Sequence, residues 1–399
     1  MQYQMTDYLN NLTPEEKLLL SLCRLEFSDE QKKRTGVLLK EVKDWDHFVD
    51  LANGHGIIAL CWHNIAVSGN SSSVPAPQSE ILHSAYLKSM AHNAFLFNQL
   101  GQTADIAKNE NIKIVLLKGI VLEKSIYGNI GLRQLSDMDL LLKVEDAILF
   151  RKILLKSGYS SMPLISPLHN RLLPYLKSHL PPLFRNGVMT EIHVRLFEEP
   201  GKSLTEELID TAYSIHGTET NLFYPRPHLF FLYLVKHLDR HEKTAHFQIK
   251  FYIDLYALLF SFFDQIINKK LFDDALKVNL INAVSEKLMI INRVWGISFP
   301  AWVNSYFEKV DPERILEKFT RLLKNPDNNQ PDPVSDSLFK PLKEIPGVIN
   351  KILFITGYIF PSQEYMKYKY GLWTRMKVML YYPVRWGEIG KRVLRREGV

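Results

Sequence analysis

Two aspartates spaced two apart, Asp137 and Asp139, lead directly into the apolar run 140–142. Side chains on a β-strand alternate between its faces, so both carboxylates would project from one face, about 6–7 Å apart along the backbone. Mg²⁺ is commonly held by one or two carboxylates together with substrate phosphates. The pair therefore predicts a metal site for phosphate chemistry. Asp44-Trp45-Asp46 has the same spacing, but we expect it to begin a helix, so the spacing alone does not identify a site.

Lys118 and Gly119 stand between an apolar run that ends at Leu117 and a predicted helix. Glycine permits a sharp turn and close approach to the backbone, and a helix N-terminus offers free N–H groups to a phosphate. We expect both residues to bind nucleotide phosphates, although an ordinary strand-to-helix turn has the same composition. Arg133 would either neutralise phosphate or fix the carboxylates through a bidentate pair, unless it is a surface arginine.

A third carboxylate is expected on a neighbouring strand, at Glu191. In the segment 188–196, Glu191, His193 and Arg195 share one face and apolar residues share the other. Such a strand either faces solvent or lines a site. We predict that Glu191 joins Asp137 and Asp139 as a catalytic and metal-binding residue.

The elements that position these residues follow from periodicity and turn composition. The first hundred residues are predicted to be helical, with Thr13 as an N-cap and Pro14 at the first helical position. Asn186-Gly187 predicts a hairpin. Helices are expected at about 80–108, 120–127 (with Gly128 as its C-cap), 145–156, 225–241 and 250–263, strands at 112–117, 138–144, 183–185 and 188–196, and loops at 68–77 and 325–333.

This order predicts an α+β fold with a small mixed sheet embedded between helical regions. We expect an N-terminal helical region at 1–108, an α/β core at 109–202, and a C-terminal helical domain with a basic tail at 203–399.

Composition favours a folded protein without a membrane span. Of the 399 residues, 46% are hydrophobic and 12% aromatic, which supports a substantial core. No segment has eighteen uncharged apolar residues, and no signal peptide is visible at the N-terminus. The two cysteines give neither a disulfide framework nor a zinc motif. We therefore expect a reduced, cytoplasmic protein.

The C-terminal tail carries the positive charge of the chain. Residues 366–399 contain nine basic and two acidic residues, whereas the whole chain has a net charge of +6. Aromatic residues are interspersed with this charge. The tail is either a surface for an anionic partner, such as RNA, polyphosphate or lipid headgroups, or a helix whose charges are simply solvated.

The run LLKG-x7-YG-x4-R-x2-SDMDLLL, followed by KSGY at 156–159 and EIH at 191–193, resembles the uncharacterised bacterial nucleotidyltransferases of the DNA polymerase β-like superfamily. The similarity spans most of the chain from about Asp44, including the segment 360–370. Val194 stands where the family has tryptophan after EIH. Lys118-Gly119 replaces the glycine-serine signature of the superfamily, as it does in this family.

The resemblance implies a two-metal transfer of a nucleoside monophosphate from an NTP to a hydroxyl acceptor. It implies that Asp137, Asp139 and Glu191 hold Mg²⁺ and that Lys118 and Gly119 hold the triphosphate. The helical segment that carries His237, His241, Lys250 and Asp254 also matches the family. Lys250 is expected at the nucleotide, unless it is a solvated helix lysine.

The two histidines, four residues apart, share one helix face. They would support the site residues or contact the acceptor, pack in the core, or bind a metal. His193 and Asp254 are further candidates for supporting roles around the site.

Two other functions remain open from the sequence. One is a catalytically silent binding or antitoxin-type protein, and the other is a kinase-like phosphotransferase. Convergence of three carboxylates would favour the nucleotidyltransferase. The acceptor, which can be a small molecule, sugar, RNA or protein, is not indicated by the sequence.

Overall fold

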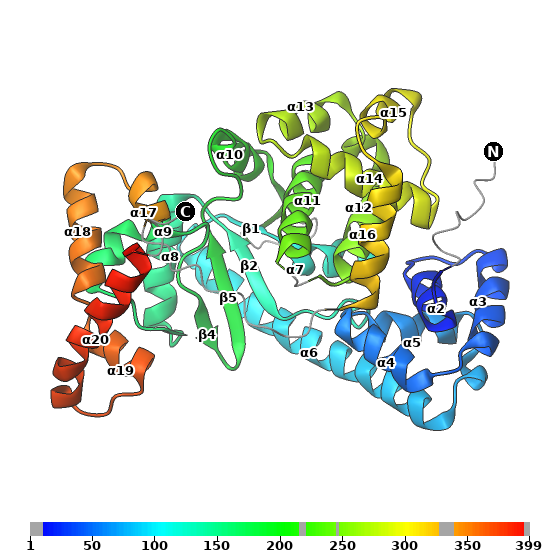
Figure 1. Cartoon of the computed structure of the whole chain (residues 1–399), viewed down its shortest axis with the longest axis horizontal. Helices are drawn as coiled ribbons and strands as arrows, with labels where there is room; N and C mark the ends of the chain where they lie inside the picture. The colour runs from blue at the N-terminus through cyan, green and yellow to red at the C-terminus, as the bar shows by residue number, and fades with distance from the viewer. Residues whose placement is uncertain (1–10, 215–220, 245–246, 327–338, 395–399) are drawn as a thin grey trace. The chain divides into compact units, whose positions relative to one another are not determined.

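The computed structural model describes residues 11–214, 221–244, 247–326 and 339–394 (Figure 1). The chain divides into two compact units. Unit 1 comprises residues 1–139 and 196–333, and unit 2 comprises residues 140–195 and 334–399. The first crossing between them falls inside a single strand, directly after Asp139.

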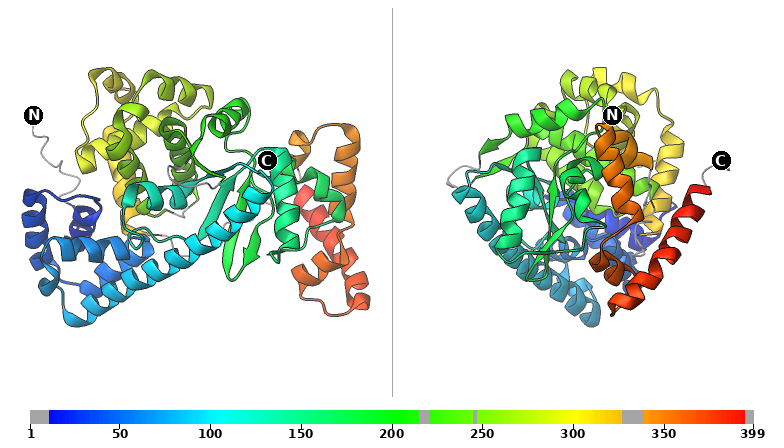
Figure 2. Two further views of the ribbon diagram at one scale, coloured as in Figure 1. Left: turned by 180° about the vertical axis from the view of Figure 1, so that it is seen from behind. Right: turned by 90° about the vertical axis from the view of Figure 1, so that its left-hand side faces the viewer.

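The described part of unit 1 begins at residue 11 with a run of five helices, in agreement with the predicted helical N-terminal region. They are α2 (Pro14–Leu22), α3 (Asp29–Glu41), α4 (Trp45–Gly54), α5 (Ile58–Val67) and α6 (Ala76–Asn109). The predicted helix starts are confirmed: Thr13 forms a capping box with Glu16, and Asp44 caps α4. Figure 2 shows α4 and α5 lying along the long helix α6, which they contact.

The predicted loop at 68–77 is shorter than expected. A 3₁₀ turn, η1 (Ser71–Ser73), interrupts it, and α6 begins at Ala76 instead of about residue 80. Pro77 was predicted to lie in this loop, but it lies in the first turn of α6, where the missing N–H group is not needed.

The later part of unit 1 is also helical. It contains α10 (Lys202–Thr211), α11 (Pro227–Lys243), α12 (Lys250–Ile266), α13 (Lys269–Lys277), α14 (Ile281–Trp295), α15 (Ala301–Phe307) and α16 (Pro312–Lys324). The predicted helices at 225–241 and 250–263 are confirmed as α11 and α12, with ends shifted by at most three residues. Tyr252 and Trp295 stack in the core between α12 and α14, with ring centroids 6.3 Å apart.

A small mixed sheet of seven strands has the order β3-β4-β5-β2-β1-β7-β6. The strands are β1 (Ile114–Leu116), β2 (Asp137–Leu141), β3 (Ser160–Ser161), β4 (Leu183–Arg185), β5 (Val188–His193), β6 (Tyr213–Ser214) and β7 (Leu222–Tyr224). Strands β1 and β7 are parallel, whereas β4 and β5 form an antiparallel hairpin. Asn186 and Gly187 both have positive φ, which confirms the predicted turn. The predicted fold class, a mixed sheet embedded in helices, is confirmed.

Unit 2 combines the β4–β5 hairpin with helices. These are α8 (Val144–Lys156), η3 (Pro167–Leu172), α9 (Leu173–Leu176), α17 (Phe339–Glu344), α18 (Val348–Ile359), α19 (Gln363–Tyr370) and α20 (Arg375–Leu394). Leu172, Ile345, Phe354 and Tyr358 form a buried cluster that holds α18 against η3. Figure 2 shows α18, α19 and α20, in orange and red, gathered into one group.

The structure does not test the predicted domain boundaries or most of one predicted loop. The predicted division at residues 108 and 202 stays a prediction, and most of the loop predicted at 325–333 lies outside the described residues. Within the described part of the chain, none of the helices is long and apolar enough to cross a membrane.

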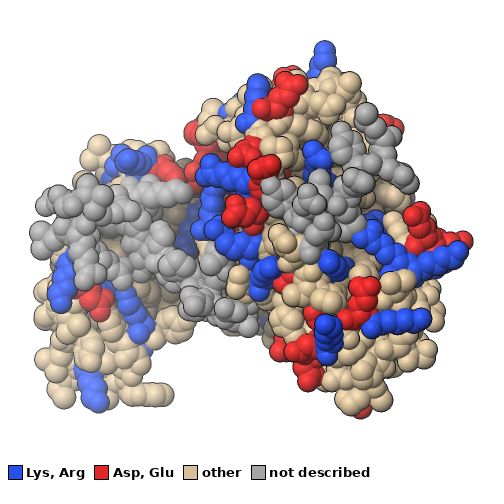
Figure 3. All heavy atoms as spheres, turned by 45° about the vertical axis from the view of Figure 1, so that its right-hand side comes forward, with Lys and Arg blue, Asp and Glu red and all other residues tan. Residues whose placement is uncertain are grey.

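Lys and Arg side chains are interspersed with Asp and Glu over the face of unit 1 in Figure 3.

A buried charge network holds the helices of unit 1 together. Glu242 of α11, whose side chain is 1% exposed, accepts hydrogen bonds from Lys287 (2.7 Å), Lys318 and Tyr252 (2.7 Å). Burial raises the pKa of Glu242, but Lys287 and Lys318 outweigh it and lower the pKa below its ordinary value. The ammonium of Lys287 is fully buried, so the network needs both signs of charge.

Glu242→Gln is therefore expected to reduce the free energy of unfolding by about 3–5 kcal/mol, because it leaves the buried charge of Lys287 without its nearer carboxylate; the other, Glu286, lies 3.6 Å away. Urea denaturation measures the change. Asp29→Asn is the matched control, because Asp29 pairs with Lys32 at an exposed site and should change stability by less than about 1 kcal/mol. Equal effects of the two substitutions would contradict the assigned network.

Candidate active site

The turn between β1 and α7 (Lys118–Leu122) has an unusual backbone. Lys118 has φ of +48°, in the left-handed region. The other described non-glycine residues with positive φ are all asparagine, which tolerates this region better. Strained residues of this kind concentrate at functional sites. The sequence predicted a turn at this point, but it assigned the special backbone to Gly119 instead of Lys118.

Lys118 forms a close ion pair with Asp139. Its Nζ atom donates to Oδ1 of Asp139 at 2.7 Å, and the Asp139 side chain is only 4% exposed. Burial alone would lower the pKa of Lys118, but Asp139, followed by Tyr233 and Asp137, raises it above the ordinary value. The lysine is thus held as a cation against the strand that carries both aspartates.

Gly119 is required by a side chain and not by the turn. A Cβ atom at this position would lie 2.0 Å from Nη1 of Arg133 and 2.6 Å from Cδ2 of Leu135. Real Cβ contacts are not this short, so any larger residue would displace the guanidinium. The group that approaches Gly119 is the Arg133 side chain, and binding of phosphate at Gly119 stays a prediction.

Arg133 is bound to Asp254 of α12 in a buried bidentate pair. Its Nε donates to Oδ1 and its Nη2 to Oδ2, each at 2.8 Å, and Asp254 is 2% exposed. The hydroxyl of Tyr127 also donates to Oδ1, at 2.9 Å. Arg133 thus forms a bidentate pair, as expected, but its partner is Asp254 and not Asp137 or Asp139. A nucleotide-binding role for Arg133 stays a prediction.

Glu123 supports this pair from the next turn. Residues Glu123–Tyr127 form a π-helix, η2, where an α-helix was predicted, and Gly128 ends it in the left-handed conformation expected of a C-cap. Oε2 of Glu123 accepts a hydrogen bond from the backbone N–H of Arg133 at 3.2 Å. Burial raises the pKa of Glu123 to about 8, against the opposing effect of Arg133. Glu123 was not identified from the sequence, and Tyr127 was noted only as the tyrosine of the YG pair in the family motif, without a role.

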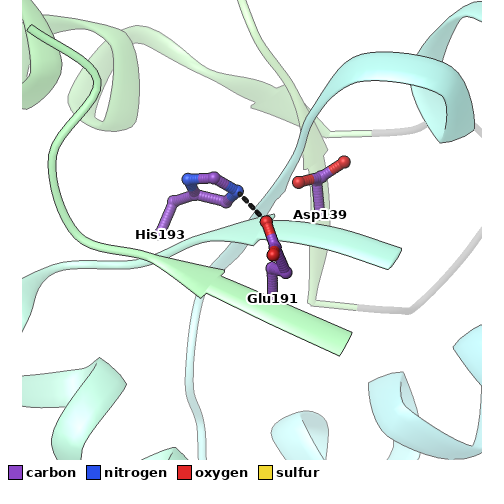
Figure 4. A group of neighbouring side chains, drawn as sticks. All are labelled: Asp139, Glu191 and His193. Carbon is purple, nitrogen blue, oxygen red and sulfur yellow. Dashed lines mark ion pairs between the residues drawn. The ribbon is translucent and has the colours of Figure 1, made fainter. Parts of the chain in front are cut away.

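Asp139, Glu191 and His193 form a group that suits a metal ion. Each offers one ligand atom, and these atoms all lie within 4.8 Å of one another. In Figure 4 the three side chains point toward one another from β2 and β5, and the dashed line joins His193 Nε2 to Glu191 Oε2 at 3.5 Å. Two carboxylates and an imidazole are ligands for a divalent cation. The predicted proximity of Glu191 to Asp139 is therefore present, and His193 joins them.

Asp137 has a different environment from Asp139. It is half-buried at the start of β2, and its Oδ1 accepts a hydrogen bond from Ser136 Oγ at 2.8 Å. It is not one of the three grouped ligands, although its charge raises the pKa of Lys118. Its assignment as a metal ligand stays a prediction.

His179 was missed by the sequence analysis. It pairs with His193 in an isolated β-bridge, and the two ring centroids are 5.6 Å apart. Burial lowers the pKa of His179, while Glu191 opposes the change. Only the pairing of the strand with a distant segment brings His179 to Glu191, so no spacing in the sequence could have indicated it.

His237 and His241 lie together on α11, as the four-residue spacing predicts. Their ring centroids are 4.4 Å apart, and both rings contact Phe251. Burial, followed by the positive charge of Lys118, lowers the pKa of His237 well below its ordinary value, while Asp139 opposes this effect. His237 is therefore neutral at pH 7 and lies within electrostatic reach of Lys118 and Asp139.

Lys250 is the first residue of α12, and its Nζ lies 5.4 Å from the ring centroid of Phe251. This places Lys250 beside the two histidines through their shared contact with Phe251. Contact of Lys250 with nucleotide phosphate stays a prediction.

A family model described as uncharacterised nucleotidyltransferase matches residues 41–296. This range includes every site residue considered above and confirms the resemblance inferred from the sequence. The similarity proposed for residues 360–370 lies outside the matched range. None of the curated proteins is detectably similar to the chain.

Gly119→Ala is expected to lower the free energy of unfolding by about 1–3 kcal/mol, because the new methyl group must displace the Arg133 guanidinium. Denaturant titration measures the loss. Gly101→Ala is the control, because nothing lies within 4 Å of a Cβ atom at that position of α6. It should stabilise the helix by about 0.5–1 kcal/mol. If Gly119→Ala were as stable as Gly101→Ala, the contact with Arg133 would be wrong.

Glu123→Gln is expected to become increasingly stabilising relative to the wild type as pH rises. The folded-state pKa of about 8 lies above the ordinary value of 4.5, so the contribution of the protonated carboxyl is complete below pH 4.5 and is lost as pH rises through about 8. Melting temperatures between about pH 5 and pH 9 measure the difference. Glu30→Gln, at an exposed position, makes the same charge change and should show no such trend. A constant difference for Glu123→Gln would contradict the raised pKa.

Proposed function

We propose that this chain, which belongs to the uncharacterised nucleotidyltransferase family, moves a nucleoside monophosphate from an NTP to a hydroxyl acceptor. The family implies a nucleotide substrate. The observation that best supports the mechanism is the convergence of Asp139, Glu191 and His193 within 4.8 Å. Like charges are costly to hold together beside a buried strand unless a cation is used there.

Lys118 already supplies one positive charge at this site and competes with a metal ion for Asp139. Its ammonium is 2.7 Å from Asp139 and offsets part of the negative charge that a divalent ion would otherwise neutralise. We propose that Asp139 and Glu191, with Asp137 and His193 near them, hold Mg²⁺. When bound, the metal lowers the pKa of the acceptor hydroxyl and offsets charge on the transferred phosphoryl group.

The remaining roles belong to side chains of this chain. In the proposed reaction the acceptor oxygen attacks the α-phosphorus, the bond to the β-phosphate oxygen breaks, and pyrophosphate leaves. Glu191 accepts the proton of the acceptor hydroxyl. Lys118, as a fixed cation, holds the negative triphosphate. His237 is neutral, so it can donate or accept a hydrogen bond at the site without adding charge.

Arg133 and Asp254 support these groups indirectly. The guanidinium lies against Gly119 and therefore limits where the Lys118 backbone can move. This gives the buried pair a positioning role in addition to its effect on stability. Direct binding of nucleotide by Lys250 and Arg133 remains part of the proposal.

Two substitutions should separate metal binding from phosphate binding. Asp139→Asn is expected to weaken binding of Mn²⁺ or Mg²⁺ at least tenfold, because it removes a charged ligand. Lys118→Met should retain or strengthen metal binding, because a competing cation is removed, and should weaken binding of a nonhydrolysable NTP at least tenfold. Thermal shifts with metal alone and with metal plus nucleotide measure both effects.

Activity is tested with NTP labelled at the α-phosphate and a fractionated cell extract as the source of acceptors. Label transferred by the wild type and lost in Asp139→Asn supports nucleotidyl transfer. Transfer of γ-label instead would identify a kinase-like reaction. Nucleotide binding without any transfer would favour the catalytically silent alternative. Lys32→Met, on the exposed surface of unit 1, serves as the matched control for Lys118→Met.

A further inference from the structure

Helix α20 of unit 2 has an exposed apolar face. Met376, Leu380 and Val384 occupy positions i, i+4 and i+8, so they form one stripe along the helix. Their side chains are 75%, 69% and 49% exposed. Met379 and the preceding Trp373 are 63% and 88% exposed. Isolated exposed apolar residues are normal, but a continuous stripe of them generally indicates an interaction surface.

The opposite face of α20 already packs against unit 2. Val378 is fully buried in a cluster with Met366 and Leu372, which Tyr382 joins. Ile389 packs against the cluster around Phe354 and Tyr358. The inward face therefore accounts for the folding of the helix. Its outward apolar stripe has no role in this packing.

Positive charge surrounds the stripe. Arg375, Lys377 and Lys391 are exposed on the same helix, and its acidic residue, Glu388, accepts from Tyr370 and lies 3.7 Å from Lys369. Over residues 342–391 there are eight basic and three acidic residues, an excess of +5. Tyr381 and Trp386 of α20 are also partly exposed, at 37% and 43%. The exposed surface thus combines aliphatic and aromatic side chains with lysine and arginine.

The combination of exposed apolar and basic side chains distinguishes a membrane surface from a nucleic acid as the partner of α20. Single-stranded nucleic acid is bound by a basic groove with aromatic rings for stacking, and an aliphatic stripe adds nothing to such binding. A helix that lies in a membrane interface buries aliphatic and tryptophan side chains at the acyl boundary, while lysine and arginine contact anionic headgroups. Both features of α20 match the second case.

We propose that the outward face of α20, with Trp373, docks onto a lipid bilayer surface that contains anionic lipids. Met376, Leu380 and Val384 enter the interface, and Arg375 and Lys377 lie at the headgroups. This binding is independent of the proposed transfer reaction, since none of these residues belongs to the candidate active site.

The full-length chain is tested by flotation with vesicles of phosphatidylcholine alone or mixed with phosphatidylglycerol. Binding is expected with the anionic vesicles and should weaken at least tenfold in the triple variant Met376→Ser, Leu380→Ser, Val384→Ser. Arg375→Gln with Lys377→Gln should weaken it severalfold and reduce its salt dependence. The matched control replaces three exposed apolar residues of unit 1, Val37, Leu87 and Leu276, by serine and should bind like the wild type.

Three outcomes would overturn the proposal. They are equal binding of the triple variant and the wild type, absence of binding to anionic vesicles, and self-association or RNA binding through the stripe in place of vesicle binding. If the triple variant does not fold, the proposal is tested on the wild type and Trp373→Phe with vesicles of brominated lipids. They should quench tryptophan fluorescence of the wild type and quench Trp373→Phe less, whereas equal quenching or none would contradict the proposal.

Discussion

The bidentate pair between Arg133 and Asp254 links the turn of the candidate site to the helical core of unit 1. It connects a residue of the loop before β2 to α12, and both groups are buried. Removing either partner would leave an uncompensated charge, which typically costs about 3–5 kcal/mol. Tyr127 and Glu123 bind to the same pair from η2. The conformation of the segment around Gly119 therefore depends on a contact outside the sheet.

The charged side chains of the candidate site leave a net negative charge that favours binding of a cation. Asp139 already has one positive partner, Lys118, yet Glu191 and His193 also place ligand atoms near it. His237 adds no positive charge, because burial and Lys118 keep it neutral. A neutral histidine beside a fixed lysine allows the local charge balance to be set by the ligands that enter. This electrostatic environment is consistent with a site for a metal ion and a polyphosphate.

Local signals in the sequence were sufficient for much of the fold. The capping box at Thr13, the Asn186-Gly187 turn and the periodicity of α11 and α12 each depend on neighbouring residues, so they could be recognised directly. The alternation of side chains on β2 and β5 also indicated Asp139 and Glu191 correctly as neighbours. By contrast, the partner of Arg133 lies 121 residues away. His179 and the π-helix depend in the same way on tertiary packing, which local patterns do not encode.

The close contact between Gly119 and Arg133 constrains how both positions can change in evolution. A side chain at position 119 and a guanidinium at position 133 exclude one another, because the two would occupy the same volume. Neither position can then change freely while the other is kept. Loss of the arginine would in turn release Asp254 from its charge requirement. Among related chains, positions 119, 133 and 254 should therefore covary as a set, even where the surrounding residues diverge.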